Sequence, residues 1–179
     1  KKIATDDGFT GKLPDIYLIT GHLTDAEMNE LYNDPKVTAM VSFTKGEGYG
    51  RPLAEFSLTG KPIIASNWSG QLDFLNKKST TLIPGVVSEV HASAVNQWII
   101  KDSKWFTINY NLAGKKMHEL ITNPILFTHP AQYQRDHILN GFTYNHMIEQ
   151  IDNHFTKFEE YHAKSSTPIE NPISLKDII

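Results

Sequence analysis

Two glutamates eight positions apart, Glu47 and Glu55, are the residues of this sequence best suited to hold a ligand. Between them the stretch GEGYGRPLAE carries Gly48, Gly50 and Pro52. Glycine lets a backbone approach a ligand closely, because no Cβ stands in the way. A carboxylate in the first turn of a helix, as expected for Glu55, suits the helix dipole and accepts hydrogen bonds from a ribose. The alternative is that the glycines only shape a turn and Glu55 only stabilises a helix end.

The residues that follow the glycines predict a phosphate site. Pro52 is expected at the first position of a helix over 52–59, where its missing N–H costs nothing. The amides of Leu53 and Ala54 are then expected to lack intrahelical partners, and together with the helix dipole they favour an anion. Arg51 beside them is expected to be solvated, with a charge directed at a diphosphate as the alternative.

Strands and helices that alternate along the chain must position this stretch. Three apolar runs predict buried strands: 15–20, 37–43 and 61–66. A capping box of Thr24 and Glu27 predicts a helix between the first two strands, and helix 52–59 joins the second strand to the third. This order is typical of an α/β fold with a Rossmann-like parallel sheet flanked by helices. Ligands of such sheets bind at the carboxyl ends of the strands, where GEGYGR is expected to lie.

The rest of the chain predicts one further strand and several helices. The strand is expected over 80–90 with an interruption at Pro84, and helices are expected over 111–122 and 130–139. Thr143 is expected to cap a long closing helix over 143–163, whose apolar residues recur every three or four positions. These elements predict one domain over 1–164 and an irregular tail over 165–179, where Ser, Thr and Pro accumulate.

Composition excludes several classes of function. The 179 residues carry a formal charge of −3, so no basic field favours nucleic acid as a partner. No apolar run is long enough to cross a bilayer, and we expect a soluble, cytoplasmic protein. The chain has no cysteine, and its eight histidines show no paired spacing typical of a metal site. No Asp-x-Asp motif is present either, so no metal is expected.

One long stretch, VSFTKGEGYGRPLAEFSLTGKPIIASNWSGQLDFL, resembles the signature of the retaining glycosyltransferases with the two-domain GT-B fold. These are the family 4-like, or group 1, enzymes, and the stretch is similar to their C-terminal, nucleotide-sugar-binding half. The matching positions are Glu47, Gly48, Tyr49, Gly50, Pro52, Glu55, Gly60, Pro62, Gly70 and Asp73. DIYLITGHLTDAEMNELY before it and GFTYNHMIEQI after it also resemble the family, so residues 15 to about 160 are covered.

The resemblance implies a role for each residue of the stretch. Glu47 would be the catalytic-site carboxylate that contacts the donor sugar, and Glu55 would hold the ribose. The turn residues would line the sugar and the diphosphate, in the order Gly48, Tyr49, Gly50, Arg51, Pro52 and Leu53. The donor would be a UDP- or GDP-linked sugar, with no other cofactor and no metal, because fixed amides can stabilise the departing diphosphate. The acceptor is open.

Departures from the family leave alternatives open. No Arg and Lys clamp for the diphosphate precedes the first strand, and the family's N-terminal half is missing, so the chain is expected to be an inactive fragment. The closing helix would pack on that missing half, or form a dimer contact. Trp68 is expected either to stack on a sugar or to be a half-buried core residue. A non-catalytic nucleotide-, sugar- or protein-binding domain and a GT-B-like nucleotide-sugar epimerase are the rival functions.

Overall fold

The computed structural model describes residue 11 and residues 14–165. The chain divides into two compact units, Lys1–Asp34 and Pro35–Ile179. The predicted irregular tail over 165–179 lies outside the described residues, except for Ser165, which is the last residue of a helix. In the described part of the chain, no helix is both long and apolar enough to cross a membrane.

Helix α2 (Asp25–Asn33) lies in the described part of the first unit, and its predicted capping box is confirmed. The amide of Thr24 donates to a carboxylate oxygen of Glu27 at 2.7 Å, and the amide of Glu27 donates to the Thr24 hydroxyl at 3.3 Å. The hydrogen bond from the Thr24 backbone, followed by that from its side chain, lowers the pKa of Glu27. The sequence signal is strong here because both partners lie within one helical turn.

The strand predicted over 15–20 is wrong. Residues 14–20 form neither helix nor strand. The apolar side chains of Ile16, Tyr17 and Leu18 are 88%, 87% and 85% exposed. An apolar run becomes a strand only where a neighbouring strand accepts and donates its ladder hydrogen bonds, and the run itself carries no information on that neighbour.

The second unit contains a parallel sheet, as predicted, but its three strands lie in the order β1-β2-β3 without the run at 15–20. Its strands are β1 (Met40–Ser42), β2 (Ile63–Ser66) and β3 (Thr81–Ile83), each shorter than the apolar run that predicted it. Val41 pairs with Ile64, and Ala65 pairs with Leu82. All four residues of the central strand β2 are buried, which is why its sequence is a continuous apolar run.

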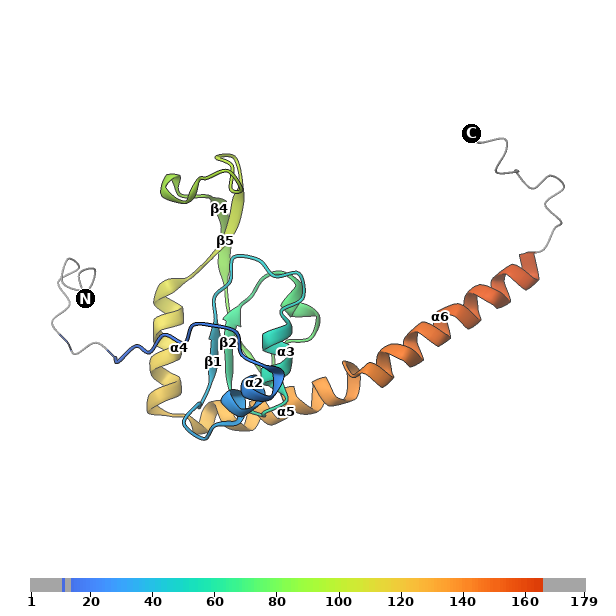
Figure 1. Cartoon of the computed structure of the whole chain (residues 1–179), viewed down its shortest axis with the longest axis horizontal. Helices are drawn as coiled ribbons and strands as arrows, with labels where there is room; N and C mark the ends of the chain where they lie inside the picture. The colour runs from blue at the N-terminus through green and yellow to red at the C-terminus, as the bar shows by residue number, and fades with distance from the viewer. Residues whose placement is uncertain (1–10, 12–13, 166–179) are drawn as a thin grey trace. The chain divides into compact units, whose positions relative to one another are not determined.

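Helices cover both faces of this sheet, and Figure 1 shows α3 (Arg51–Ser57) and α4 (Tyr110–Thr122) on opposite sides of the strands. Helix α4 adds Ala113, Leu112, Met117 and Leu120 to a core with Ile64 and Ile83. Helix α3 packs against β1 and against α5 (Ile125–Gly141). The fold is therefore α/β with a parallel sheet flanked by helices, as the alternation of elements predicts.

The start of helix α5 differs from the prediction, and the long closing helix agrees with it. Helix α5 begins at Ile125 rather than at Pro130, and the proline lies inside it. Pro130 is the sixth residue of α5, so the ring removes one hydrogen bond near the helix start rather than in the middle of the helix. The long closing helix is confirmed as α6 (Tyr144–Ser165), and the Thr143 hydroxyl caps it by accepting from the amide of His146 at 3.2 Å.

Residues beyond Pro84 leave the parallel sheet. Strand β4 (Gly85–Glu89) pairs antiparallel with β5 (Lys104–Ile108), which the sequence analysis did not predict. Gly85 faces Ile108, and a Cβ there would collide with the carbonyl oxygen of Thr107. The predicted single strand with an interruption is thus two strands in two different sheets, joined at Pro84.

Candidate functional site

The GEGYGR turn lies at the carboxyl edge of the parallel sheet, between β1 and α3, as predicted. Gly50 is buried and has a φ of 93°, a left-handed conformation that favours glycine. A Cβ on Gly50 would also lie 3.2 Å from the Cβ of Gln71, so the turn has no room for a side chain there. The predicted residues Glu47, Gly48 and Tyr49 are brought together on this turn, and the side chains of Glu47 and Tyr49 remain partly exposed.

A second turn, after β2, holds the first one in place. The Ser69 hydroxyl donates to the carbonyl oxygen of Glu47 at 2.6 Å and accepts from the amide of Glu47 at 3.0 Å. The amide of Gly70 donates to the same carbonyl oxygen at 3.1 Å. The backbone of Glu47 is therefore fixed on both sides, and its carboxylate is presented from a rigid position.

Ser69 was not among the predicted site residues. It adopts a φ of 72° in the described part of the chain, where every other residue with a positive φ is a glycine. Such strain persists only where the surroundings hold it, and it concentrates at functional sites. The signal in the sequence is weak, since Ser-Gly after a strand is a common turn, and the contact to Glu47 spans 22 positions.

The expectation that the amides of Leu53 and Ala54 lack intrahelical partners is wrong. Both amides donate to the carbonyl oxygen of Gly50, at 2.9 and 3.2 Å. Pro52 is the second residue of α3, not the first, because the helix begins at Arg51. Leu53 is 2% exposed and belongs to the core. Within the described residues the amides of Gly50 and Arg51 donate no backbone hydrogen bond, unlike those of Leu53 and Ala54.

Glu55 lies one helical turn after Arg51 and forms an ion pair with it. The distance from Nε of Arg51 to Oε1 of Glu55 is 3.0 Å, and the two side chains are 78% and 42% exposed. Exposed pairs of this kind contribute about 0.2–1 kcal/mol. Arg51 is thus both solvated and paired, and a hydroxyl ligand of Glu55 must share its carboxylate with the guanidinium group.

Tyr49 in the first turn and Trp68 in the second each pack against a phenylalanine. The Tyr49 ring lies 4.9 Å from that of Phe74, and burial, together with the charge of Asp73, raises the pKa of the Tyr49 phenol. Trp68 is 41% exposed and stacks on Phe106 with ring centroids 5.3 Å apart. One face of the Trp68 ring is therefore occupied by Phe106, and a ligand could stack only on the other face. Of the two expectations for Trp68, the half-buried packing residue agrees with this contact.

A groove of about 820 Å³ extends from Tyr49 along the start of α6. Phe142, Tyr144 and Met147 line it together with the polar side chains of His146, Gln150 and His154. The side chains of His146 and Gln150 are hydrogen-bonded to each other at 2.8 Å. His146, Gln150 and His154 follow one another at intervals of four positions, which places them along one helical face.

Buried polar atoms without a partner lie near the same edge of the sheet. Among the described residues these are Thr44 Oγ1, Asn67 Oδ1 and Gln71 Oε1. Gln71 is fully buried, and its amide nitrogen donates to the carbonyl and the hydroxyl oxygens of Ser66, at 2.7 and 2.9 Å. Each buried polar atom without a partner costs about 1–3 kcal/mol, so such atoms are few in native structures.

Together the fold and the site define an α/β domain with a glycine-rich turn and two partly exposed carboxylates at the carboxyl edge of a parallel sheet. In the part of the chain that the structure describes, no three His, Asp or Glu side chains are grouped to hold a metal ion. A scan against models of known protein families finds none that matches this chain. A search of curated proteins likewise finds no significant match.

Proposed function

We propose that this chain binds a nucleotide-sugar donor as the C-terminal half of a retaining glycosyltransferase of the GT-B type. The observation that carries the proposal is the GEGYGR turn at the carboxyl edge of the sheet, whose Glu47 backbone is held by Ser69 and Gly70. A carboxylate fixed in this way suits the hydroxyl groups of a sugar, because no conformational entropy of the turn is lost on binding.

The chemistry of a departing nucleoside diphosphate fits the start of α3. Charge develops on phosphate oxygens as the sugar leaves, and backbone amides already oriented toward them stabilise it without reorganisation. The amides of Gly50 and Arg51 take this role in the proposal, in place of those of Leu53 and Ala54. The guanidinium group of Arg51 adds a positive charge one turn from Glu55, which would bind the ribose.

Exposed apolar side chains favour a second candidate function, a protein-binding domain on the same scaffold. Phe155, Phe158 and Tyr161 on α6 are 64%, 60% and 68% exposed. Contiguous apolar surface of this kind is typical of a face that another protein covers. The two candidates differ in one measurable property, which is binding of a nucleoside diphosphate.

We expect Glu55→Gln to weaken the binding of UDP or GDP to the 179-residue chain by about tenfold or more. The amide keeps the shape of the side chain but loses the charge-assisted hydrogen bonds to the ribose. Glu47→Gln is expected to leave the affinity for the bare diphosphate nearly unchanged, because its partner in the proposal is the sugar. Calorimetry or an NMR titration of the wild type and both variants measures the difference.

The matched control is Glu159→Gln, which removes the same charge from the exposed face of α6. It separates a local effect at Glu55 from a change in net charge. Equal affinities for all four proteins, or amide shifts remote from residues 46–55, would reject the nucleotide site. The protein-binding function would then be the better proposal.

A further inference from the structure

A second pocket lies at the opposite edge of the parallel sheet, where β2 and β3 begin. Its lining includes Ile63 and Thr81, the first residues of these two strands, and its volume is about 230 Å³. The proposed donor site lies beyond the other ends of the same strands. The pocket is much larger than the roughly 30 Å³ that a water molecule occupies in the liquid, so it has room for a phosphate group.

The charges around this pocket are unbalanced. Lys77, Lys78 and Lys116 line it, against one carboxylate, that of Glu119. Ser79 and Thr80 add hydroxyl groups from the same turn as the first two lysines. The formal charge of the whole chain is −3, so this positive cluster is a local feature and not part of a general basic surface.

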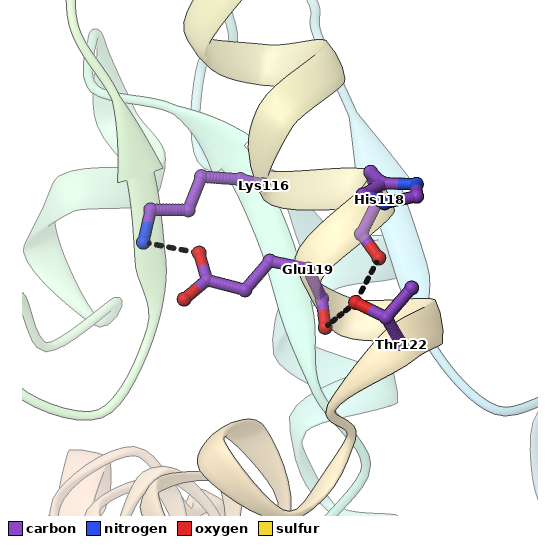
Figure 2. Close-up of polar contacts among 4 residues, drawn as sticks. All are labelled: Lys116, His118, Glu119 and Thr122. Carbon is purple, nitrogen blue, oxygen red and sulfur yellow. Dashed lines mark hydrogen bonds and ion pairs between the residues drawn. The ribbon is translucent and has the colours of Figure 1, made fainter.

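Lys116 and Glu119 form an ion pair at the wall of the pocket, on α4. Figure 2 shows the two side chains extending toward each other, with Nζ of Lys116 2.8 Å from Oε2 of Glu119. The hydrogen bond from Lys116 lowers the pKa of Glu119. Both side chains are about one-third exposed, at 35% and 33%, so a ligand in the pocket can reach either of them.

Hydrogen bonds to Gln134 on α5 hold the turn that carries Lys77 and Lys78. The side-chain oxygen of this buried glutamine accepts from the amide of Asn76 at 2.9 Å and from the hydroxyls of Ser79 and Thr80. The side chain of Asn76 in turn accepts from the amide of Lys78 at 2.9 Å. The turn is therefore preorganised, and an incoming anion does not have to order it.

We propose that this pocket binds a phosphate group, either as inorganic phosphate or at the end of a small phosphomonoester. The lysines act as point charges for the dianion, because the hydroxyls of Ser79 and Thr80 already donate to Gln134. The phosphate takes the place of the Glu119 carboxylate as the partner of Lys116. The three lysines around one pocket favour a doubly charged ligand over a single carboxylate.

The proposal makes an unusual prediction: removing the carboxylate of Glu119 should increase the affinity for phosphate. Glu119→Gln is expected to tighten the binding of inorganic phosphate about threefold, because it removes a like charge and releases Lys116. Lys116→Gln is expected to weaken it about tenfold, and the Lys77→Gln, Lys78→Gln double variant by a similar factor. NMR titration of the full chain with inorganic phosphate, at low and constant ionic strength, measures these changes.

Two comparisons make the test specific. Lys157→Gln, an exposed lysine on α6, should bind phosphate like the wild type. Glu55→Gln should also bind it like the wild type at this pocket, so the outcome is independent of the donor site. Parallel titrations with inorganic phosphate and methyl phosphate distinguish the free ion from the esterified group. Equal affinities in the Glu119, Lys116 and Lys157 variants, or shifts confined to residues outside the pocket, would overturn the proposal.

Discussion

Gly70→Ala is expected to lower the free energy of unfolding by about 2–3 kcal/mol and to displace the GEGYGR turn. A Cβ on Gly70 would collide with the carbonyl oxygen of Gly48 and lie 2.6 Å from its carbonyl carbon. Both obstacles are backbone atoms, so no rotation of a side chain relieves the clash. The hydrogen bond from the Gly70 amide to Glu47 would be lost in the same movement. Chemical denaturation followed by circular dichroism measures the loss.

Gly114→Ala is the matched control for this prediction. Gly114 lies inside α4, and a Cβ there would have no atom within 4 Å apart from its own neighbours in the chain and the backbone of its helix. Alanine is the better helix former, so this variant is expected to be more stable by about 0.5–1 kcal/mol. The two glycine substitutions are thus expected to move the unfolding midpoint in opposite directions. A Gly70→Ala protein as stable as the wild type would mean that the two turns are not in contact.

Gln134→Met is expected to destabilise the chain by about 3 kcal/mol. Gln134 is 2% exposed, and its amide nitrogen donates to the carbonyl oxygen of Phe74 at 2.9 Å while its oxygen accepts from three groups of the 76–80 turn. Methionine has nearly the same length and retains the apolar contacts, so the loss reports the polar network. Thr80 and the carbonyl of Phe74 would be left buried without this partner, which is the costly part of the change.

Gln132→Met on the same helix separates this network from a general effect of the substitution. Gln132 is exposed, and its side chain donates one hydrogen bond, to the carbonyl oxygen of Gly60 at 3.0 Å. We expect it to cost less than about 1 kcal/mol. Denaturation of both variants under the same conditions makes the comparison, and equal losses would contradict the structural role of Gln134. A Gln134 variant should also bind phosphate less well, since the turn with Lys77 and Lys78 would be less ordered.

Structural features whose interacting residues lie close together in the sequence were predictable from the amino acids alone. The Thr24 and Glu27 capping box, the Thr143 cap of α6 and the left-handed Gly60 after α3 each depend on contacts within a few residues. The apolar runs at β1 and β2 were predictable as well, because strands covered on both faces contain few polar residues. The parallel order of these strands followed from the helix between them.

Contacts between distant parts of the chain decided the rest. Ser69 reaches Glu47 across 22 positions, and Gln134 reaches Asn76 across 58. No periodicity or cap in the sequence encodes such a partner. The exposed run at 15–20 and the antiparallel pair β4–β5 show the same limit, since an apolar segment has the same pattern whether or not a neighbouring strand pairs with it.

The two proposed sites also contain features that the sequence predicts and features that only the folded structure shows. The sequence by itself determined that glycines and two carboxylates follow β1, because their spacing is local. Only the tertiary structure decided that the amides of Leu53 and Ala54 are already bonded to Gly50, and that Lys116 on α4 lies at one pocket with Lys77 and Lys78. Charges separated by 38 positions become neighbours only when the helix that carries one of them packs beside the strand that follows the others, and that packing is a property of the folded core.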